Sequence, residues 1–424
     1  MKVLWLCNII MPDICSELSL PKNNTGGWMV SLSKAISQDN KIELAIAAPG
    51  NVDKVQKIIK DNIIYYIYPQ KNFTLTRYKQ EGSNEFEVII KEFNPSLVHI
   101  FGTEFPYGLC FLENNTSNIP NVVSIQGMVS MISRYYLSNI SNIDIIKNIT
   151  FRDIIKNDNI FQAKKRYYKR GVNEVKILRN TKNIIGRTNW DFSETRIINP
   201  KINYYYCDEA IRDSFFKNKW DIEACEKNTI FVSQGMYPIK GLHILINAIG
   251  LLKHKYNNIK VYVAGVNKIS GNKIKDKLKR DGYSNYIKKL IKKKNLDENI
   301  IFLGSLEEDE MARQMVKANV SVMPSSIENS PNSLIEAMVM GVPCIASYVG
   351  GIPDIIEDNV TGLLYRFEDY EVLAYHIDNI FSDNELSSKL STAAYLSANR
   401  KYKKQNIVED TYKIYESILK SEVF

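Results

Sequence analysis

The sequence predicts an α/β protein with two doubly wound domains. Three observations support this fold class. The chain has 424 residues, which is long for a single hydrophobic core and typical of two. Short apolar runs of β type alternate with amphipathic helical runs in both halves of the chain. Between the halves, a stretch of helical pattern interrupts that alternation.

The first half alternates strands and helices. Its apolar runs are mostly continuous, as expected of parallel strands that are covered on both faces. The predicted strands are 3–7, 42–47, 63–68, 97–101 and 122–125. Helical spacing of apolar residues predicts helices at 28–37 and 85–93. The first run lacks a small-residue cleavage site, so we expect a buried strand there and not a signal peptide.

The middle of the chain, about 135–187, is predicted as helices and is rich in basic side chains. Within 145–187, twelve Lys or Arg residues face only three acidic residues. One interpretation is a solvated helical face. The other is attraction to an anionic membrane surface, which the interleaved Phe161, Tyr167 and Tyr168 would suit.

The second half repeats the strand-then-helix order. The predicted strands are 229–233, 260–264, 300–303, 320–323, 344–347 and 362–365. The predicted helices are 241–254, 284–295, 307–317, 331–340 and 370–380. A final helical stretch has no strand after it, so we expect it to pack across the domains or return to the first. The predicted domains are therefore two Rossmann-like domains at 1–200 and 201–390, and a C-terminal helix at 391–424.

Composition argues against several classes of protein. The six cysteines and four histidines are scattered, and no Cys-x-x-Cys pair occurs, so neither a zinc site nor a disulfide framework is expected. A net charge of +8 without a recognised motif does not indicate nucleic-acid binding. No apolar run approaches the roughly 18 residues of a membrane helix.

The most informative segment is SSIENSPNSLIEAMVMGVPCIASYVGGIPDII, residues 325–356. Ser330 is a good N-cap and Pro331 suits the first helical position, so we expect a helix to begin there. Its first free N–H groups are expected to point above the sheet, where the helix dipole favours a phosphate. These N–H groups belong to Asn332, Ser333 and Leu334.

Two carboxylates flank this helix start. Glu328 lies in the preceding loop, and Glu336 lies inside the helix. Two acids beside a phosphate are electrostatically unfavourable unless the ligand also carries hydroxyl groups, as a nucleotide sugar does. For either residue alone, a capping residue or an exposed helical Glu is the simpler interpretation. The loop, the cap and the spacing together favour the ligand.

The order Pro-Ser, Glu, Glu-Ala-Met, Gly-Val-Pro and Gly-Gly-Ile-Pro-Asp over 324–354 resembles the retaining glycosyltransferases of family 4, the type found in capsule and O-antigen synthesis. The resemblance implies the GT-B fold, in which two Rossmann-like domains face each other across a cleft. It implies that the first domain binds the acceptor and the second binds the nucleotide-sugar donor. It also implies that Glu328 contacts the donor sugar and Glu336 the ribose. The usual Gly-Phe-Gly after the first Glu is replaced here by a polar variant beginning at Asn329.

A second donor element is expected in 231–249. Lys240 stands where a helix opens, and its ammonium can pair with a diphosphate and stabilise it as a leaving group. The alternative is an ordinary surface lysine at a helix start. The family usually places an Arg in this stretch too, but this chain has Gln234, which can donate a hydrogen bond without adding charge.

The first domain offers weaker candidates. Gly26 and Gly27 permit close backbone approach to a donor phosphate or an acceptor, although a simple tight turn is the alternative. Gln126 cannot act as a general base, so it either orients an acceptor hydroxyl or leaves proton transfer to the donor phosphate. Thr103 lies in a predicted acceptor loop at 101–104. His99 is an acceptor-side candidate, with a packed strand histidine as the alternative.

These features predict a retaining glycosyltransferase of hexosyltransferase type. We expect it to move a sugar from a UDP- or GDP-linked donor to a glycan or lipid-linked glycan in surface polysaccharide synthesis. No cofactor or metal is expected, because the positive groups take that role and no Asp-x-Asp motif stands at a strand end. We expect a cytoplasmic protein, peripheral on the inner membrane face through 145–187.

Two classes of alternative stay open. One is another GT-B enzyme, either a nucleotide-sugar epimerase or a phosphorylase. The other is a non-catalytic partner subunit that keeps the donor fold, which we would expect to have lost Glu328 or Lys240.

Overall fold

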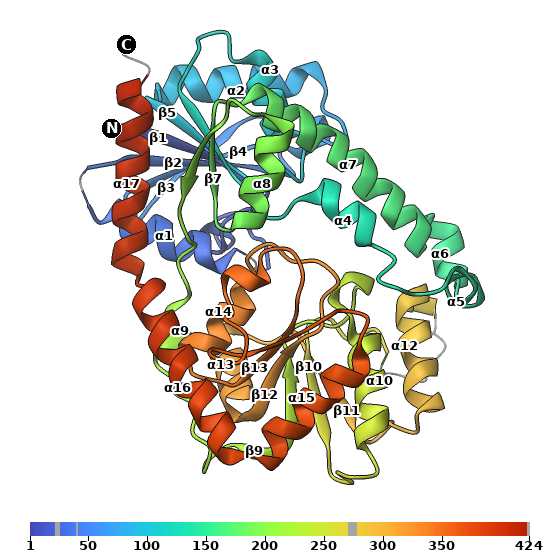
Figure 1. Cartoon of the computed structure of the whole chain (residues 1–424). Coiled ribbons are helices and arrows are strands. Elements are labelled where there is room, and N and C mark those ends of the chain that lie inside the picture. Colours follow the sequence, from blue (N-terminus) through green and yellow to red (C-terminus); the bar gives the residue numbers. More distant parts are fainter. Residues whose placement is uncertain (22–25, 40, 270–277, 422–424) are drawn as a thin grey trace. The chain divides into compact units, whose positions relative to one another are not determined.

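The computed structural model describes residues 1–21, 26–39, 41–269 and 278–421 (Figure 1). The chain forms two compact units, and each is assembled from separate stretches of sequence. The first unit contains Met1–Met131, Arg166–Arg212 and Tyr402–Phe424. The second unit contains Ile132–Lys165 and Asp213–Lys401.

The first unit is built on an eight-stranded sheet with the order β3-β4-β2-β1-β5-β6-β7-β8. All neighbouring strands run parallel except β3, which is antiparallel to β4. The strands are β1 (Lys2–Leu6), β2 (Glu43–Gly50), β3 (Gln56–Lys60), β4 (Ile63–Pro69), β5 (Leu97–Phe101), β6 (Asn121–Ser124), β7 (Asn183–Gly186) and β8 (Asn203–Tyr206).

Helices accompany this sheet along the chain. They are α1 (Gly27–Ser37), α2 (Gln80–Phe93), α3 (Tyr107–Asn114), α8 (Asn189–Ile198), α17 (Lys404–Ser421) and the short 3-10 helices η1 (Pro12–Ile14) and η2 (Gln70–Asn72). Two further helices, α4 (Val129–Tyr135) and α7 (Ile160–Asn180), each contain a boundary between the units.

The core of the first unit lies on both faces of the sheet, as the continuous apolar strands predict. Along β1, Val3 and Trp5 belong to one buried cluster, and Leu4 and Leu6 belong to another. Helix α17 completes the first of these clusters with Tyr415, whose hydroxyl accepts a hydrogen bond from the Trp5 indole at 3.0 Å. The expected return of the C-terminal helix to the first domain is therefore confirmed.

The second unit contains a six-stranded, fully parallel sheet with the order β11-β10-β9-β12-β13-β14. Its strands are β9 (Glu226–Val232), β10 (Lys260–Ala264), β11 (Ile300–Gly304), β12 (Ala318–Met323), β13 (Cys344–Ser347) and β14 (Leu363–Tyr365). Its helices include α5 (Asn142–Lys147), α6 (Phe151–Lys156), α9 (Asp213–Phe216), α10 (Leu242–Leu252), α12 (Gly282–Lys293), α13 (Glu308–Lys317), α14 (Asn332–Val339), α15 (Tyr370–Ser382), α16 (Asn384–Lys401), η3 (Pro238–Lys240) and η4 (Ile352–Asp354).

Among the elements that the sequence missed are β3, β8 and α3. Strand β3 is mostly exposed, and the NYYY run of β8 is only half-buried. Both are terminal strands of the sheet, so each has one neighbour and lacks the continuous apolar pattern of the central strands. Helix α3 is short and follows Pro106, and its mixture of glycine, aromatic and apolar residues resembles a buried loop.

The compact units also depart from the predicted boundaries at 200 and 390. Residues 132–165 group with the second unit, where His243 Nε2 lies 2.7 Å from the carbonyl of Ser138 and the hydroxyls of Ser138 and Ser326 lie 2.9 Å apart. These are long-range polar contacts that no local pattern marks. In place of the predicted C-terminal helix at 391–424, the structure has two helices. Helix α16 belongs to the second unit and α17 to the first.

Candidate functional site

Three neighbouring strands of the second unit bring the predicted donor residues to one edge of the sheet. Lys240 follows β9, Glu328 follows β12 and Gly350 follows β13. Because the strands are parallel, their carboxyl ends meet at the same edge, which is where ligands bind in open α/β sheets.

Lys240 and Glu328 lie in direct contact at this edge. The Lys240 Nζ is 2.5 Å from Glu328 Oε1, and the Ser325 hydroxyl donates to the same oxygen at 2.7 Å. The side chains of Lys240 and Glu328 are 23% and 13% exposed. A partly buried ammonium and carboxylate therefore share one site that still reaches solvent.

Two glycines allow the loops of this site to approach one another. Gly241 has φ +66°, and a Cβ there would lie 1.6 Å from the carbonyl oxygen of Pro324. Gly350 has φ +51°, and a Cβ there would lie 1.9 Å from the carbonyl oxygen of Glu328. The N–H of Gly351 donates to that same carbonyl at 3.1 Å. The backbone carrying Glu328 is therefore held against the loop that follows β13.

The start of α14 differs from the prediction. Pro331, and not Ser330, is the N-cap residue, and α14 begins at Asn332. The Leu334 N–H donates to the Pro331 carbonyl at 3.0 Å, because the first turn closes tightly. The expectation that Leu334 offers a free donor was therefore wrong. The backbone N–H groups of Asn332 and Ser333 lie at the start of α14, before Leu334.

Two further donor-side candidates lie near these loops. Glu336 is buried within α14. Gln234 follows β9, and its Cγ lies 3.5 Å from the position that a Cβ on Gly265 would occupy, just after β10. The ligand contacts expected of Glu336 and Gln234 stay predictions.

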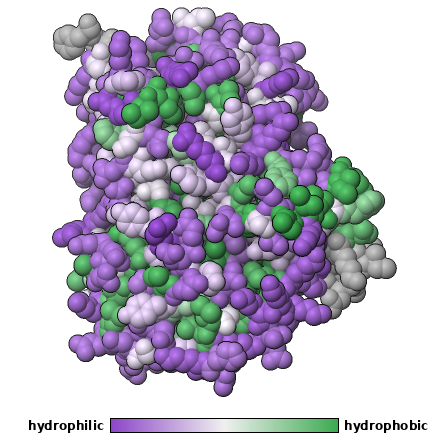
Figure 2. Space-filling model, turned by 45° about the vertical axis from the view of Figure 1, so that its right-hand side comes forward, coloured by the Kyte–Doolittle hydropathy of each residue, from purple (hydrophilic) through white to green (hydrophobic). Residues whose placement is uncertain are grey.

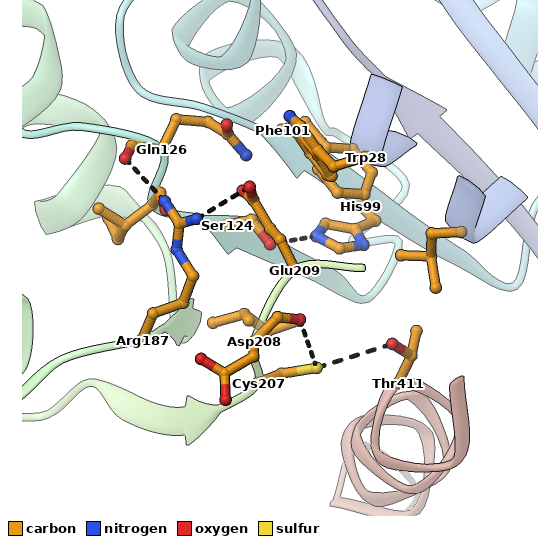
Figure 3. A pocket seen from close by; sticks show the side chains of 13 residues that line it. Trp28, His99, Phe101, Ser124, Gln126, Arg187, Cys207, Asp208, Glu209 and Thr411 are labelled. Atoms are coloured by element: carbon orange, nitrogen blue, oxygen red, sulfur yellow. Dashed lines mark hydrogen bonds and ion pairs between the residues drawn. The ribbon is translucent and has the colours of Figure 1, made fainter. Parts of the chain in front are cut away.

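A pocket in the first unit collects residues that follow three adjacent strands (Figure 3). Gln126 follows β6, Arg187 follows β7, and Asp208 and Glu209 follow β8, while Trp28 enters from α1. The Arg187 guanidinium lies 2.9 Å from the Glu209 carboxylate and donates to the Gln126 carbonyl at 2.8 Å. The Gln126 Nε2 is buried and has no hydrogen-bond partner among the described residues.

Two acceptor-side candidates are buried and hydrogen-bonded to other side chains. Both ring nitrogens of His99 are engaged, Nδ1 with the Tyr415 hydroxyl and Nε2 with the Ser124 hydroxyl, each at 2.6 Å. Burial lowers the pKa of His99 to about 3, so its ring is neutral. Thr103 is fully buried and donates to the carboxylate of Glu174 at 2.6 Å. These contacts favour a packed strand histidine for His99, although it also lines the pocket of Figure 3, and acceptor contact by His99 or Thr103 stays a prediction.

The glycine pair at the start of α1 has a local explanation. Gly26 has φ +75°, and a Cβ there would lie 2.1 Å from the Ile9 side chain. A Cβ on Gly27 would lie 2.6 Å from the side chain of Arg212. The positive φ of Gly26 explains that glycine, whereas a side chain at Gly27 would only require Arg212 to shift, and a ligand contact by either glycine stays a prediction. The neighbouring Asn24 and Thr25 lie outside the described residues.

Sequence reasoning missed several residues around the first-unit pocket. Arg187 follows β7, and its position directly after the short apolar run at 184–185 was the available signal. Asp208 and Glu209 follow β8, a strand that was not predicted, so nothing marked them. Glu104 lies beside Gly102 and Gln126, and burial raises its pKa to about 7.

Neither a metal cluster nor a spanning helix occurs in the part of the chain that the structure describes. No group of three or more His, Cys, Asp or Glu side chains there could hold a metal ion. None of the described helices is long and apolar enough to cross a membrane.

Most of the second unit matches the model of a known protein family. The model of the family described as "Glycosyl transferases group 1" matches residues 214–397. Residues 214–397 are therefore similar to this family. The match covers the strands and loops that carry Lys240, Glu328 and Glu336. Membership of family 4 itself stays a prediction.

Curated relatives match this chain over part of their length. N-acetyl-alpha-D-glucosaminyl L-malate synthase of Bacillus anthracis is 29% identical over 32% of this chain and 35% of its own. An uncharacterized glycosyltransferase of Methanocaldococcus jannaschii, MJ1607, is 26% identical over 57% of this chain and 54% of its own. The chain thus matches about a third to a half of the length of these relatives.

Solved structures extend the likeness to the whole chain. Sucrose-phosphate synthase from Thermosynechococcus elongatus aligns with a TM-score of 0.73 and 15% identity over 99% of each chain. Anabaena HepE, solved in complex with UDP and glucose, aligns with a TM-score of 0.66 and 14% identity over 98% of this chain and 100% of its own. This chain therefore has the predicted GT-B fold.

Proposed function

We propose that this protein is a retaining glycosyltransferase that uses a nucleoside diphosphate sugar as donor. The single observation that carries the proposal is the contact between Lys240 and Glu328 at the carboxyl edge of the second sheet, beside the start of α14. A cation, helix amides and a carboxylate suit a ligand that carries both phosphates and hydroxyl groups.

In the proposed reaction, the bond between the sugar anomeric carbon and the diphosphate oxygen breaks. A bond from an acceptor hydroxyl to the same carbon forms on the same face of the sugar. The proton of that hydroxyl passes to the departing diphosphate, so that no protein base is needed. Lys240 and the amides of Asn332 and Ser333 stabilise the negative charge that develops on the diphosphate.

The two carboxylates, Glu328 and Glu336, bind different parts of the donor. Glu328 holds the sugar hydroxyls, since its carboxylate is partly exposed beside Lys240. Glu336 accepts hydrogen bonds from the ribose. Gln234 adds a neutral donor near the phosphates. The proposal requires no divalent metal, because Lys240 and the helix start supply the positive groups. UDP and GDP are the expected nucleotides, and HepE, a neighbour in fold, was solved with UDP and glucose.

The acceptor is proposed to be a glycan or a lipid-linked glycan bound by the first unit. Gln126 supports this assignment because its Nε2 is buried without a partner among the described residues and lines the pocket. Trp28 adds an aromatic surface and Asp208 a carboxylate, which suit a hydroxylated ring. A role in surface polysaccharide synthesis agrees with relatives such as the amylovoran biosynthesis glycosyltransferase AmsK of Erwinia amylovora.

A ligand screen followed by a product assay tests the proposal. The purified chain is heated with UDP, GDP, CDP and their sugars, because a ligand that binds only the folded state raises its melting temperature. The best donor is then incubated with glycan acceptors, and the anomeric configuration of the product is read by NMR. A product of inverted configuration contradicts retention. Epimerised donor without acceptor would indicate an epimerase, and absence of any nucleotide-dependent shift would refute donor binding.

A further inference from the structure

Helices α5 and α6 present an exposed apolar face on the second unit. Five side chains on these two short helices are each between 60% and 70% exposed. They are Ile143, Ile146, Phe151, Ile154 and Ile155. We call these five residues the α5–α6 face. Figure 2 shows apolar side chains gathered at the right-hand edge of the molecule, where Figure 1 places α5 and α6. Such a cluster is uncommon on a soluble surface unless it meets a partner.

The opposite face of the same two helices is fixed to α12. Ile145 is buried, and the Asn285 side-chain amide donates to Asn148 Oδ1 at 3.2 Å. Gly282, at the start of α12, approaches so closely that a Cβ there would lie 2.9 Å from an Asp153 carboxylate oxygen. The apolar face is therefore held outward by packing on its other side.

Local caps fix both helices and engage their acidic side chains. The Ser141 hydroxyl caps α5 and donates to Asp144 at 2.7 Å. Thr150 and Asp153 form a reciprocal capping box at the start of α6. These carboxylates serve the fold, so the exposed charges that border the α5–α6 face are Lys147 and Lys156.

The predicted basic segment 145–187 is thus not one basic surface. Arg152 pairs with Asp153 at 3.3 Å and with Asp158 at 3.1 Å. Arg170 donates to the Glu104 carbonyl at 2.7 Å, and Arg187 is buried beside Glu209. The basic side chains relevant to the face are instead lysines of α5, α6 and α12. Lys289 of α12 donates to the Lys147 carbonyl at 3.4 Å, which places it at the end of α5.

We infer that the α5–α6 face docks on an anionic phospholipid bilayer. Aliphatic side chains with one phenylalanine, bordered by lysines, suit partial insertion among acyl chains while the ammonium groups meet lipid phosphates. A protein interface is the weaker match, because interface cores are enriched in aromatic residues, Met and Arg and depleted in Lys, whereas this face has four isoleucines and one phenylalanine bordered by lysines. This inference stands apart from the proposed reaction, since binding to lipid requires neither donor nor acceptor.

Vesicle flotation tests the inference with the full chain. One set of vesicles is phosphatidylcholine alone, and a second contains about a third phosphatidylglycerol. The chain is expected to float with the anionic vesicles only. Ile154→Ser combined with Ile155→Ser should weaken this binding at least about 10-fold, since two buried aliphatic side chains are lost. Lys147→Gln combined with Lys156→Gln should also weaken it about 10-fold and reduce its dependence on salt.

Matched variants separate docking from folding. Leu251→Ser combined with Leu396→Ser removes two exposed aliphatic side chains elsewhere on the second unit, 50% and 62% exposed, and should leave flotation unchanged. The melting temperature and the nucleotide-induced shift should be the same in all variants. The inference is overturned if the unmodified chain does not float, or if both serine pairs weaken flotation equally. It is also overturned if Ile154→Ser with Ile155→Ser instead abolishes self-association measured by sedimentation, because a second copy then covers the face.

Discussion

Replacing Lys240 with methionine removes the ammonium from the donor site and keeps most of the side-chain length. The 2.5 Å contact with Glu328 is lost, and Glu328 keeps only the Ser325 hydroxyl at its Oε1. Losing one partner of a fully buried ion pair costs about 3–5 kcal/mol, and an exposed pair contributes under about 1 kcal/mol. With side chains 23% and 13% exposed, we expect a loss of about 1–2 kcal/mol in unfolding free energy.

The expected effect on catalysis is larger. Removing one group that stabilises developing charge typically costs about 3–4 kcal/mol, so kcat should fall about 10²- to 10³-fold. Stability is measured by urea unfolding, and kcat by release of the nucleoside diphosphate. The double variant Lys240→Met with Glu328→Gln should recover the lost stability, because no carboxylate is left without its cation, but it should not recover activity.

A matched control uses another lysine–carboxylate pair. Lys60 lies 2.6 Å from Glu17 in the first unit, and their side chains are 33% and 34% exposed. Lys60→Met should leave kcat unchanged. The reasoning is refuted if Lys240→Met lowers stability as expected but lowers kcat less than about five-fold, because the pair would then serve only the fold.

Three further predictions concern other parts of the chain. Glu336→Gln should weaken nucleotide binding about 10-fold at unchanged melting temperature, measured by titration calorimetry, and equal affinity would contradict the ribose assignment. Gly350→Ala should lower the melting temperature and activity together, since its Cβ would meet the Glu328 carbonyl at 1.9 Å; an unchanged melting temperature would show that the loop can move. Burial lowers the pKa of His99 to about 3 and that of His243 to about 4, so the unfolded state binds protons first as pH falls below about 6.5. Each histidine should then cost about 1.4 kcal/mol of stability per pH unit down to its folded pKa, measured by urea unfolding from pH 7 to pH 5, and a flat profile would contradict this.

The sequence was most informative where local pattern and structure coincide. The central strands were found because each is a continuous apolar run covered on both faces, and Lys240 and Glu328 were found because they follow such strands. The direct contact between these two side chains could not be predicted, since it depends on glycine-permitted approach of three loops. Asp208 and Glu209 were missed because the strand before them is half-buried and lies at a sheet edge.

The contacts of two other candidates were missed for a different reason. His99 was an acceptor-side candidate on the predicted strand 97–101, and its partner Tyr415 is more than 300 residues away in the sequence. Thr103 is likewise bound to Glu174 from a distant helix. Long-range hydrogen bonds of this kind decide whether a polar residue is structural, and a single sequence does not contain them.

The place of α17 in the first unit affects how this chain is made. The hydroxyl of Tyr415 accepts a hydrogen bond from Trp5 of β1, so the first unit lacks part of its core until α17 has left the ribosome. About 190 residues separate Arg212 from Tyr402, which corresponds to a delay of about 10–40 s at typical rates of translation. The second unit can fold during that interval, whereas the first unit keeps an apolar surface exposed to solvent. A fragment ending near Arg212 would keep that surface open permanently, so expressing the N-terminal part alone should give an aggregating product.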